Sequence, residues 1–433
     1  MNQAAATGRG LGYDGLALAV IAGHVDSQSS SDMLDAFRAT TVDQVAAGLT
    51  GRASTARSEV TEPAARDIVV SGTFDEINTT FVEREWSDGL PIVPPTIDRI
   101  EAFLRHTRLP ADASLGIARP SGRELSVWSI AVNGVMAGCT PEQMPVLVAL
   151  AEVIADPAYG VQHSGNTTGA DALIVINGPN RGRLGFNHAA GALRDGYQAN
   201  TTIGRWWRLY LRNVCGFTPG EHDKATFGNS FRVVLAEDDS ALTDMGWGLF
   251  SSRFGFSPDD DVVTVARYNS GAIIGSVYGS TPEQILPYLA DGLTRVAAWD
   301  LAHTYGLGSG QLRPLLVLSP ILARVFSGAG WTQDRLREAL FEHARIPAWK
   351  FERYIGEWSN LVPGRRTLVD LVNFRKLPPV FAESTDPDRL VPIVTAASCF
   401  DLAVAGDPYR TNAYALSSDG PHGFPTAKRI HWC

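Results

Sequence analysis

A cysteine at the start of a predicted helix is the residue whose type and position point most directly to chemistry. Cys139 precedes 140–143, where a threonine suits the N-cap, a proline the first helical position and a glutamine the end of a capping box. Exposed amides and the helix dipole at such a position stabilise a thiolate and lower its pKa. The alternative is a small buried hydrophobe, because free cysteines are among the most buried residues. The sequence leaves both interpretations open.

Two histidines lie in glycine- and serine-rich loops shortly before apolar segments that are typical of buried strands. His163 precedes 173–177, and His303 precedes 315–319. Loops at the ends of parallel strands are where ligands usually bind, and an imidazole near Cys139 would activate its thiol. We therefore expect His163 to be a general base or acid and His303 to contact substrate. The alternative is a pair of unrelated surface histidines.

The stretch between residues 178 and 228 is dense in glycine, asparagine and arginine. Guanidinium groups and backbone amides beside glycines recognise carboxylates or phosphates, so this cluster predicts an anionic or acyl group on the substrate. The spacing of Arg205, Arg208 and Arg212 is equally typical of a solvated helix face. The candidate substrate-binding residues in this stretch are Arg181, Asn187, Asn200, Arg205 and Asn213.

An acid, an imidazole and a second acid stand side by side at Glu221, His222 and Asp223, which is poor spacing for metal ligands. The sequence has no HExxH motif, paired CxxC, calcium loop, Walker loop or GxGxxG placed after a strand. A GxSxG elbow is also missing, which disfavours an ordinary serine hydrolase. We therefore expect no metal site, and the cofactor is unknown.

Two stretches of the chain are nearly the same, which predicts an internal duplication. Gly138–Pro145 reads GCTPEQMP and Gly279–Leu286 reads GSTPEQIL, and each is followed by an apolar helical run, a histidine-bearing loop and a buried strand. The two strands start 142 residues apart, at 173 and 315. The conspicuous chemical difference between the copies is Cys139 against Ser280.

The elements that would position these residues are those of an α/β fold. Strands that alternate with helical patterns favour parallel sheets covered on both faces. We predict an N-terminal extension (1–66) and two pseudo-repeated α/β halves (67–240 and 241–433), with mainly parallel sheets and a cleft between the halves. The expected strands are 126–132, 173–177, 231–236, 262–265, 315–318 and 391–394, and the expected helices include 74–86 and 332–344.

Composition restricts the class of protein. A chain of 433 residues suggests two or three domains, and a net charge of −9 disfavours a nucleic-acid binder. The four cysteines are far apart, which fits a reducing cytoplasm better than a disulfide framework. No apolar run reaches the roughly 18 residues that a membrane span needs. We expect a cytoplasmic protein without a membrane partner, and a homo-oligomer is compatible with the sequence.

Six segments in one order resemble a large, poorly characterised bacterial family with WxDGLPxVPPT and VMAGCxPE motifs. Members of this family look like proteins that accompany a second, small protein, and that small protein carries a selenocysteine-Gly-Ser-Cys motif. The resemblance therefore implies thiol or selenol redox chemistry and a redox partner protein. The resemblance also implies that Asp88, Asn133, Asp223 and Thr226 are site residues, and that Asn133 and Thr226 bind substrate. The segments are WSDGLPIVPPT (86–96), AVNGVMAGCTPEQMPVLVALAEV (131–153), LIVINGPNRGRLGFN (173–187), ANTTIGRWWRLYLRNV (199–214), PGEHDKATFG (219–228) and LSPILARVFSGAGW (318–331).

The leading hypothesis is a small-molecule enzyme that acts on an anionic or acyl substrate through the thiolate of Cys139. Thiol-dependent transfer, lysis and reduction are all open. One alternative is a lyase or hydrolase that uses Asp88, His163 and Asp223 as acid and base, with a structural cysteine. The other is a non-catalytic binding protein or the scaffold subunit of a redox complex.

Overall fold

The structure, a computed structural model, is built around one large sheet. Its seven strands run in the order β4-β3-β5-β10-β6-β9, and β11 pairs with β5. The strands are β3 (Asp171–Asn177), β4 (Leu235–Ala236), β5 (Val262–Ile274), β6 (Leu315–Leu318), β9 (Asp401–Val404), β10 (Ala413–Ser418) and β11 (Thr426–Arg429). The described residues are 8, 17–21, 29–51, 64, 66–228, 233–297, 312–353, 367–418 and 423–433.

The fold is α/β, but its main sheet is mixed. Strands β3 and β4 are parallel, as are β6 and β9, whereas the four pairs that involve β5 or β10 are antiparallel. The expectation of mainly parallel sheets is therefore wrong. Crossovers that contain helices do join the two parallel pairs, but β5 and β10 return beside them in the opposite direction. Alternating helical and strand patterns do not specify the direction of those returning strands.

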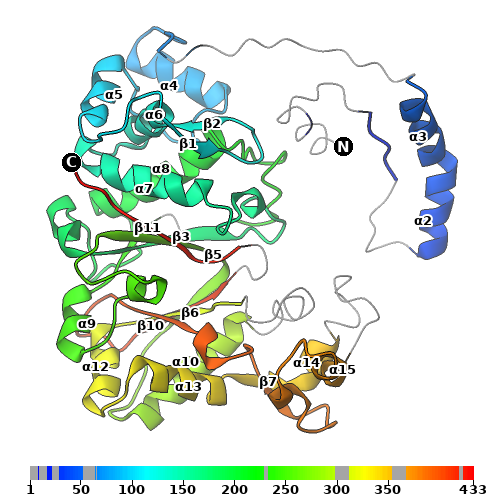
Figure 1. Ribbon diagram of the computed structural model, residues 1–433, viewed down its shortest axis with the longest axis vertical. Helices are drawn as coiled ribbons and strands as arrows, with labels where there is room; N and C mark the ends of the chain where they lie inside the picture. The colour runs from blue at the N-terminus through cyan, green and yellow to red at the C-terminus, as the bar shows by residue number, and fades with distance from the viewer. Residues whose placement is uncertain are drawn as a thin grey trace.

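The sheet curls until its two edges meet. The Asp238 N–H, just beyond β4, donates to the Val404 carbonyl at the end of β9 over 2.7 Å. The Val404 N–H in turn donates to the Glu237 carboxylate over 3.1 Å. Apolar residues from both ends of the strand order pack together inside the curl, Leu173 and Leu235 with Leu315 and others. The strands of the two halves consequently face each other across this interior (Figure 1).

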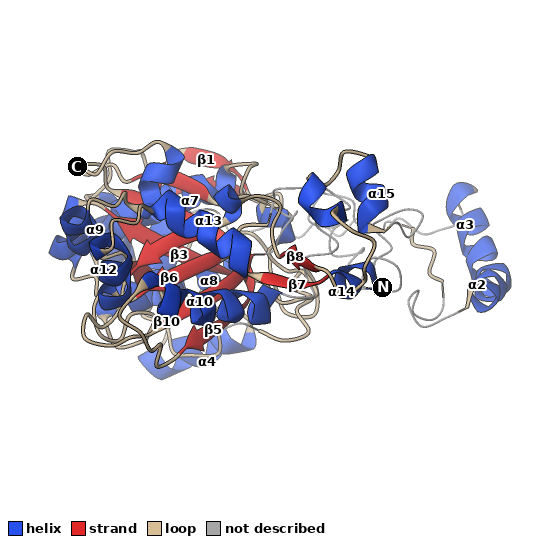
Figure 2. Cartoon of the chain, turned by 90° about the horizontal axis from the view of Figure 1, so that it is seen from below, coloured by secondary structure: helices blue, strands red, loops and turns tan. Residues whose placement is uncertain are grey.

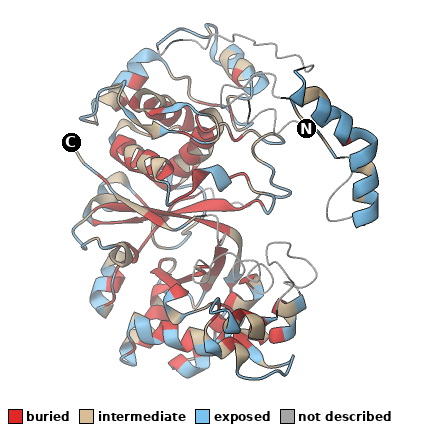
Figure 3. Ribbon diagram, turned by 45° about the vertical axis from the view of Figure 1, so that its right-hand side comes forward, coloured by how far each residue is buried: buried red, intermediate tan, exposed pale blue. Residues whose placement is uncertain are grey.

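Helices cover the outside of the curled sheet (Figures 1 and 2). Side chains alternate along each strand, so Ile174 packs outward and Val175 inward. One outer core lies between β3, β5 and the helices α6 (Val127–Ala137), α7 (Met144–Ala155) and α8 (Gln198–Asn213). A second lies between β6, β10 and the helices α10 (Pro282–Ala297), α12 (Pro320–Gly328) and α13 (Gln333–His343). Figure 3 shows burial concentrated on the helix faces that meet the strands.

Smaller elements surround this framework. The helices are α2 (Ser30–Ala36), α3 (Val42–Leu49), α4 (Phe74–Glu83), α5 (Ile97–Leu104), α9 (Asp239–Met245), α14 (Ala348–Arg353) and α15 (Leu368–Asn373). Two short hairpin pairs are β1 (Ser114–Ile117) with β2 (Glu124–Ser126), and β7 (Arg345–Pro347) with β8 (Leu390–Pro392). Helices α2 and α3 contain no buried residue and lie to one side of the sheet (Figure 2). Within the described ranges, none of the helices combines the length and apolar character needed to span a bilayer.

Most predicted elements are present, but one predicted strand is a helix in the structure. Strand 315–318 is β6, strand 262–265 extends to Ile274 as β5, and Thr332 caps α13. The strand predicted at 126–132 is wrong, because Ser126 caps helix α6 there. A short apolar run fits a buried helix as well as a strand, and α6 is buried along most of its length. The strand predicted at 231–236 is seen as β4 over 235–236, and residues 231–232 lie outside the described part.

Candidate functional site

Cys139 occupies the predicted turn, but its surroundings do not favour a thiolate. Gly138, in the left-handed region at φ 81°, ends α6. The capping box of Thr140 and Gln143 forms as expected and leads into α7. Burial raises the pKa of the Cys139 thiol to about 12, against smaller lowering effects of the Thr202 hydroxyl and the Arg205 charge. The expected lowering of the pKa is therefore reversed, because loss of hydration outweighs the helix terminus.

The structure describes one of the two predicted histidines, and that residue is exposed. His163 is exposed at the end of a 3₁₀ turn (Val161–His163), whereas Cys139 is buried among α6, α7 and α8. His303 lies outside the described residues. Of the two interpretations that the sequence left open, the environment of Cys139 favours the small packing residue.

Asp88 and Arg205 form a bidentate ion pair that holds the loop containing Asp88 against α8. Arg205 Nε and Nη2 donate to the two Asp88 carboxylate oxygens over 3.0 and 2.9 Å, and Nη2 also donates to the Pro91 carbonyl over 2.8 Å. Burial would raise the pKa of Asp88, but the hydrogen bonds and charge of Arg205 outweigh it and lower the pKa. Both groups are thus committed to each other, which is a positioning role.

The asparagines at predicted site positions form similar hydrogen bonds with other parts of the chain. Asn213 Nδ2 donates to Asn133 Oδ1 over 2.9 Å and to the Trp86 carbonyl over 3.0 Å, which secures the same loop. Asn200 accepts from the Asn187 N–H over 2.9 Å and donates to the Asn187 carbonyl over 3.0 Å. None of these four asparagines lines any of the cavities described below.

Asp223 and Thr226 belong to a loop held against the segment before β3. Arg208 lies 3.0 Å from the buried Asp171 and 4.0 Å from Asp223, so two carboxylates share one guanidinium. The exposed Thr226 donates its N–H to the Thr167 carbonyl over 3.1 Å. Arg208 is thus a partly exposed member of a charge cluster that includes the buried Asp171.

Arg181 is the predicted binding residue that lines a cavity of ligand size. This cavity, of about 470 Å³, lies beyond the carboxyl ends of the parallel strands β3 and β4, and we call it the His188 cavity. Its wall includes Arg181, His188 and Asp239. Carboxyl ends of neighbouring parallel strands are common ligand sites, because loops from several strands converge there.

The strand ends hold the acid groups of the His188 cavity in place. Asp239, at the start of α9, accepts from the Gly178 N–H over 2.7 Å and from Asn177 Nδ2 over 3.0 Å. Gly178 has φ 118°, and a side chain there would overlap Asp261. Arg181 Nε lies 3.6 Å from Asp239, and its Nη1 has no hydrogen-bond partner among the described residues.

Burial shifts the protonation of this cluster toward neutral groups. Burial and the nearby Arg181 charge lower the pKa of His188, although Asp238, 3.7 Å away, opposes the shift. Burial also raises the pKa of Asp239. The neutral His188 imidazole is therefore available at pH 7 to accept a proton, and Asp238 is near enough to stabilise the resulting cation.

Glu237 links this cluster to the closure of the sheet. Its carboxylate accepts from Asn177 Nδ2 over 2.6 Å, from the Phe250 N–H over 2.7 Å and from the Val404 N–H. Burial raises its pKa to about 8, with a contribution from the Asp239 charge. Sequence reasoning missed the acidic run 237–239, although its position directly after a predicted strand was a usable signal.

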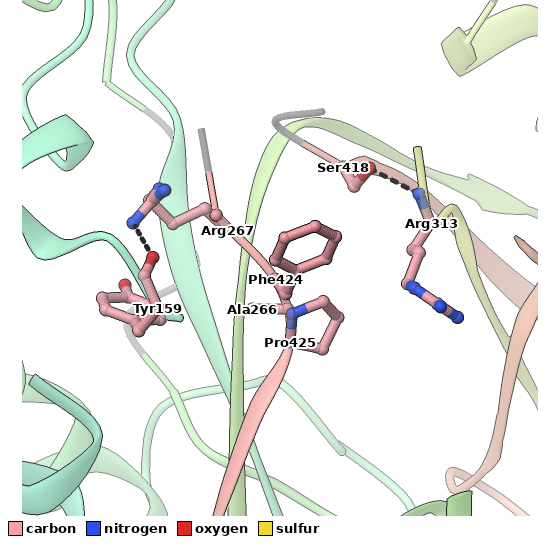
Figure 4. Close-up of a pocket in the computed structure, with 8 residues that line it drawn as sticks. Tyr159, Ala266, Arg267, Arg313, Ser418, Phe424 and Pro425 are labelled. Atoms are coloured by element: carbon pink, nitrogen blue, oxygen red, sulfur yellow. Dashed lines mark hydrogen bonds between the residues drawn. The ribbon is translucent and has the colours of Figure 1, made fainter. Parts of the chain in front are cut away.

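A second, very small cavity has a structural explanation. It is lined by Tyr159, Arg267, Arg313 and Ser418 among others and has a volume of about 10 Å³, room for one water molecule (Figure 4). Arg267 donates to the Tyr159 and Gly160 carbonyls over 3.0 Å each, and the Arg313 N–H donates to Ser418 Oγ over 2.8 Å. These arginines therefore hold chain segments together.

Comparison with family models, curated proteins and solved structures gave no significant match. Within the ranges that the structure describes, no group of three or more His, Cys, Asp or Glu side chains is arranged to hold a metal ion. The geometry of the His188 cavity is therefore the basis for a functional assignment.

Proposed function

We propose that this protein is an enzyme of small-molecule metabolism that performs acid–base chemistry, as a lyase or hydrolase, in the His188 cavity. The observation that carries the proposal is the convergence of His188, Arg181 and Asp239 on one cavity beyond two parallel strands. His188 is the general base, Asp238 stabilises its protonated form, and Arg181 binds the group on which negative charge develops.

The charges around the cavity narrow the substrate to an acyl compound. Arg181 shares its charge with Asp239, and Asp244 also lines the cavity. A phosphate would meet these carboxylates at close range, whereas a single carbonyl oxygen needs one donor. In hydrolysis, neutral His188 takes a proton from water, the hydroxide adds to the acyl carbon while the carbonyl oxygen gains charge beside Arg181, and the leaving alcohol or amine departs with the proton from His188. In lysis, His188 takes the proton next to the carbonyl, a carbon–carbon double bond forms, and the group on the adjacent carbon departs with that proton.

A cytoplasmic location is part of the proposal. All four cysteines are free in the structure, which is the state expected where glutathione keeps thiols reduced. Thiol-dependent chemistry at Cys139, with a redox partner, is the rival hypothesis, and it would require the thiol to become exposed during the reaction. A binding or scaffold subunit is the second rival.

We also propose that the two halves arose by duplication. The order α7, β3, β4, β5 parallels the order α10, β6, β9, β10, so the first copy extends through β5 to Ile274, beyond the boundary at residue 240 that the sequence suggested. The pairing is also matched, because β3 and β6 each have a parallel neighbour on one side and an antiparallel neighbour on the other. The two halves meet where β5 pairs with β10. This arrangement supports a pseudo-two-fold relation between the copies.

The test of the enzymatic proposal is turnover of a library of esters, amides and hydroxy acids, with products identified by mass spectrometry. General acid–base groups contribute about 10²- to 10⁴-fold, so His188→Asn should lower turnover by at least about 100-fold. The exposed His431→Asn is the matched control and should retain activity. Activity that survives in His188→Asn but is lost in a folded Cys139→Ser protein would refute the proposal in favour of the thiol hypothesis.

A further inference from the structure

A larger cavity opens at one end of the curled sheet, where strands of both halves contribute. It has a volume of about 740 Å³, and we call it the mouth cavity. Its strand-derived wall includes Leu235 (β4), Ile273 (β5), Val317 (β6), Ala405 just beyond β9, and Tyr414 (β10). This size is typical of small-molecule sites, and the mouths of closed sheets are frequent positions for them.

The floor of the mouth cavity is apolar. Leu235, Val317 and Ala405 belong to the cluster that fills the interior of the curled sheet. At the edge of the cavity Ile273 is 65% exposed, although it lies on a strand of the central sheet. The cavity therefore offers an apolar surface that continues from the core to solvent, which a hydrocarbon chain would cover favourably.

The rim of the mouth cavity carries two arginines whose guanidinium groups are uncommitted. Arg194 and Arg410 line it, and neither side chain forms a hydrogen bond or an ion pair with a residue that the structure describes. Two acids, Asp195 and Asp407, line the same cavity beside the arginines, and the Asp407 carboxylate accepts from the Tyr409 N–H over 2.9 Å. The two cations are thus available to an anionic ligand.

Ser319 adds a second polar feature to the wall of the mouth cavity. It is the N-cap residue of α12 and lines the cavity, but its hydroxyl makes no capping hydrogen bond. The residue is 4% exposed, and its Oγ has no partner among the described residues. A buried hydroxyl without a partner is costly, so a ligand acceptor that reaches it would be stabilised.

The mouth cavity is separate from the His188 cavity, and the two share a loop. The chain passes from His188, in the wall of one, to 191–195, in the wall of the other. Between them the Gly406 N–H donates to the His188 carbonyl over 2.7 Å, which joins the loop to the second half. Leu193, in the same loop, has φ 66°, a strained value for a residue with a side chain.

We propose that the mouth cavity is a second binding site, which takes a monocarboxylate with an unbranched hydrocarbon chain. The carboxylate lies between Arg194 and Arg410, and the chain extends along Leu235, Val317 and Ala405. This site goes beyond the proposed acid–base chemistry and does not depend on it. The apolar floor favours a ligand with a hydrocarbon chain over a short polar substrate.

Isothermal titration of the full chain with butanoate, hexanoate and octanoate tests this site. Each buried methylene should tighten binding about fourfold, because its transfer from water is worth about 0.8 kcal/mol. Arg194→Gln with Arg410→Gln should weaken octanoate binding roughly five- to tenfold, as expected for two partly exposed charge contacts. Arg183→Gln, at an exposed arginine of the His188 cavity loop, is the matched control and should bind as the parent does.

Two further measurements protect the test against misfolding and non-specific adsorption. Ile273→Glu changes an exposed residue, so the protein should fold while losing octanoate affinity through repulsion and loss of apolar surface. Octylamine, with the same chain and the opposite charge, should bind more weakly than octanoate. The proposal is overturned if octanoate gives no saturable binding at millimolar concentration, if affinity does not depend on chain length, or if octylamine binds equally well.

Discussion

Alkylation of Cys139 separates the thiol hypothesis from the acid–base hypothesis most directly. With a pKa of about 12, Cys139 has a thiolate fraction of about 10⁻⁴ at pH 8. An accessible thiol with the ordinary pKa of about 8.5 is roughly one quarter thiolate at that pH. We therefore expect iodoacetamide to react with Cys139 at least about a thousandfold more slowly than with an accessible thiol, since burial also restricts the reagent.

The chain contains its own standards for this assay. Cys433 is exposed, whereas Cys139, Cys215 and Cys399 are buried. Peptide mass spectrometry after timed quenching gives a separate rate for each residue. Cys433 should be alkylated first, and Cys215, whose pKa is also raised by burial, should be protected together with Cys139. In urea all four should react at similar rates.

One result would refute this reasoning. If Cys139 in the folded protein is alkylated as fast as Cys433, it is neither buried nor protonated in solution, and the thiolate hypothesis regains support. Protection of such a reactive Cys139 by a ligand would then assign it to the substrate site. A pH profile of the rate would give its pKa directly.

Two predictions concern the ion pair and the buried acid. Asp88→Asn should lower the free energy of unfolding in urea by about 1–3 kcal/mol, because Arg205 loses a charged partner, whereas the exposed Asp112→Asn should not. Because the pKa of Asp88 is lowered in the folded protein, this difference should be present above pH 4 and shrink as the pH falls through the folded pKa; a constant difference would contradict the pairing. For Glu237, whose folded pKa is raised from 4.5 to about 8, the stabilisation is complete below pH 4.5 and is lost as the pH rises to about 8. The Tm of the parent should therefore fall relative to that of Glu237→Gln over this range, and parallel Tm curves would argue against a protonated Glu237.

The parts of the fold that the sequence predicted correctly are those set by local chemistry. The capping box of Thr140 and Gln143 and the N-cap Thr332 form as expected, because both depend on side chains within three residues. The strand 315–318 was found from its continuous apolar run. The direction of β5 and β10 and the meeting of the sheet edges at Glu237 depend on contacts between distant segments. No local pattern encodes those.

One predicted site residue, Arg181, lines a cavity described above, whereas others do not. The difference lies in the hydrogen-bond partners that each polar group has. The sequence identified Arg181 and Arg205 by the same argument, as donors near glycines that follow a strand or line a helix. Arg205 donates from Nε and Nη2 to Asp88 and from Nη2 to a backbone carbonyl, so these donors are engaged within the chain. An arginine that binds a ligand and an arginine that hydrogen-bonds to another part of the chain can have the same residue type and spacing, so the sequence could not distinguish the two roles.

The criterion that does separate them is the balance of donors and acceptors around each charge. Asp88, Asn133, Asn200 and Asn213 have their polar atoms engaged with other parts of the chain, so replacing one of them should disturb folding before it disturbs chemistry. Arg181, beside a cavity, retains a buried nitrogen that has no hydrogen-bond partner in the part of the chain that the structure describes. Such a group is costly to keep in a fold unless a ligand completes it, and for that reason we propose the His188 cavity, rather than the cysteine turn, as the site of chemistry.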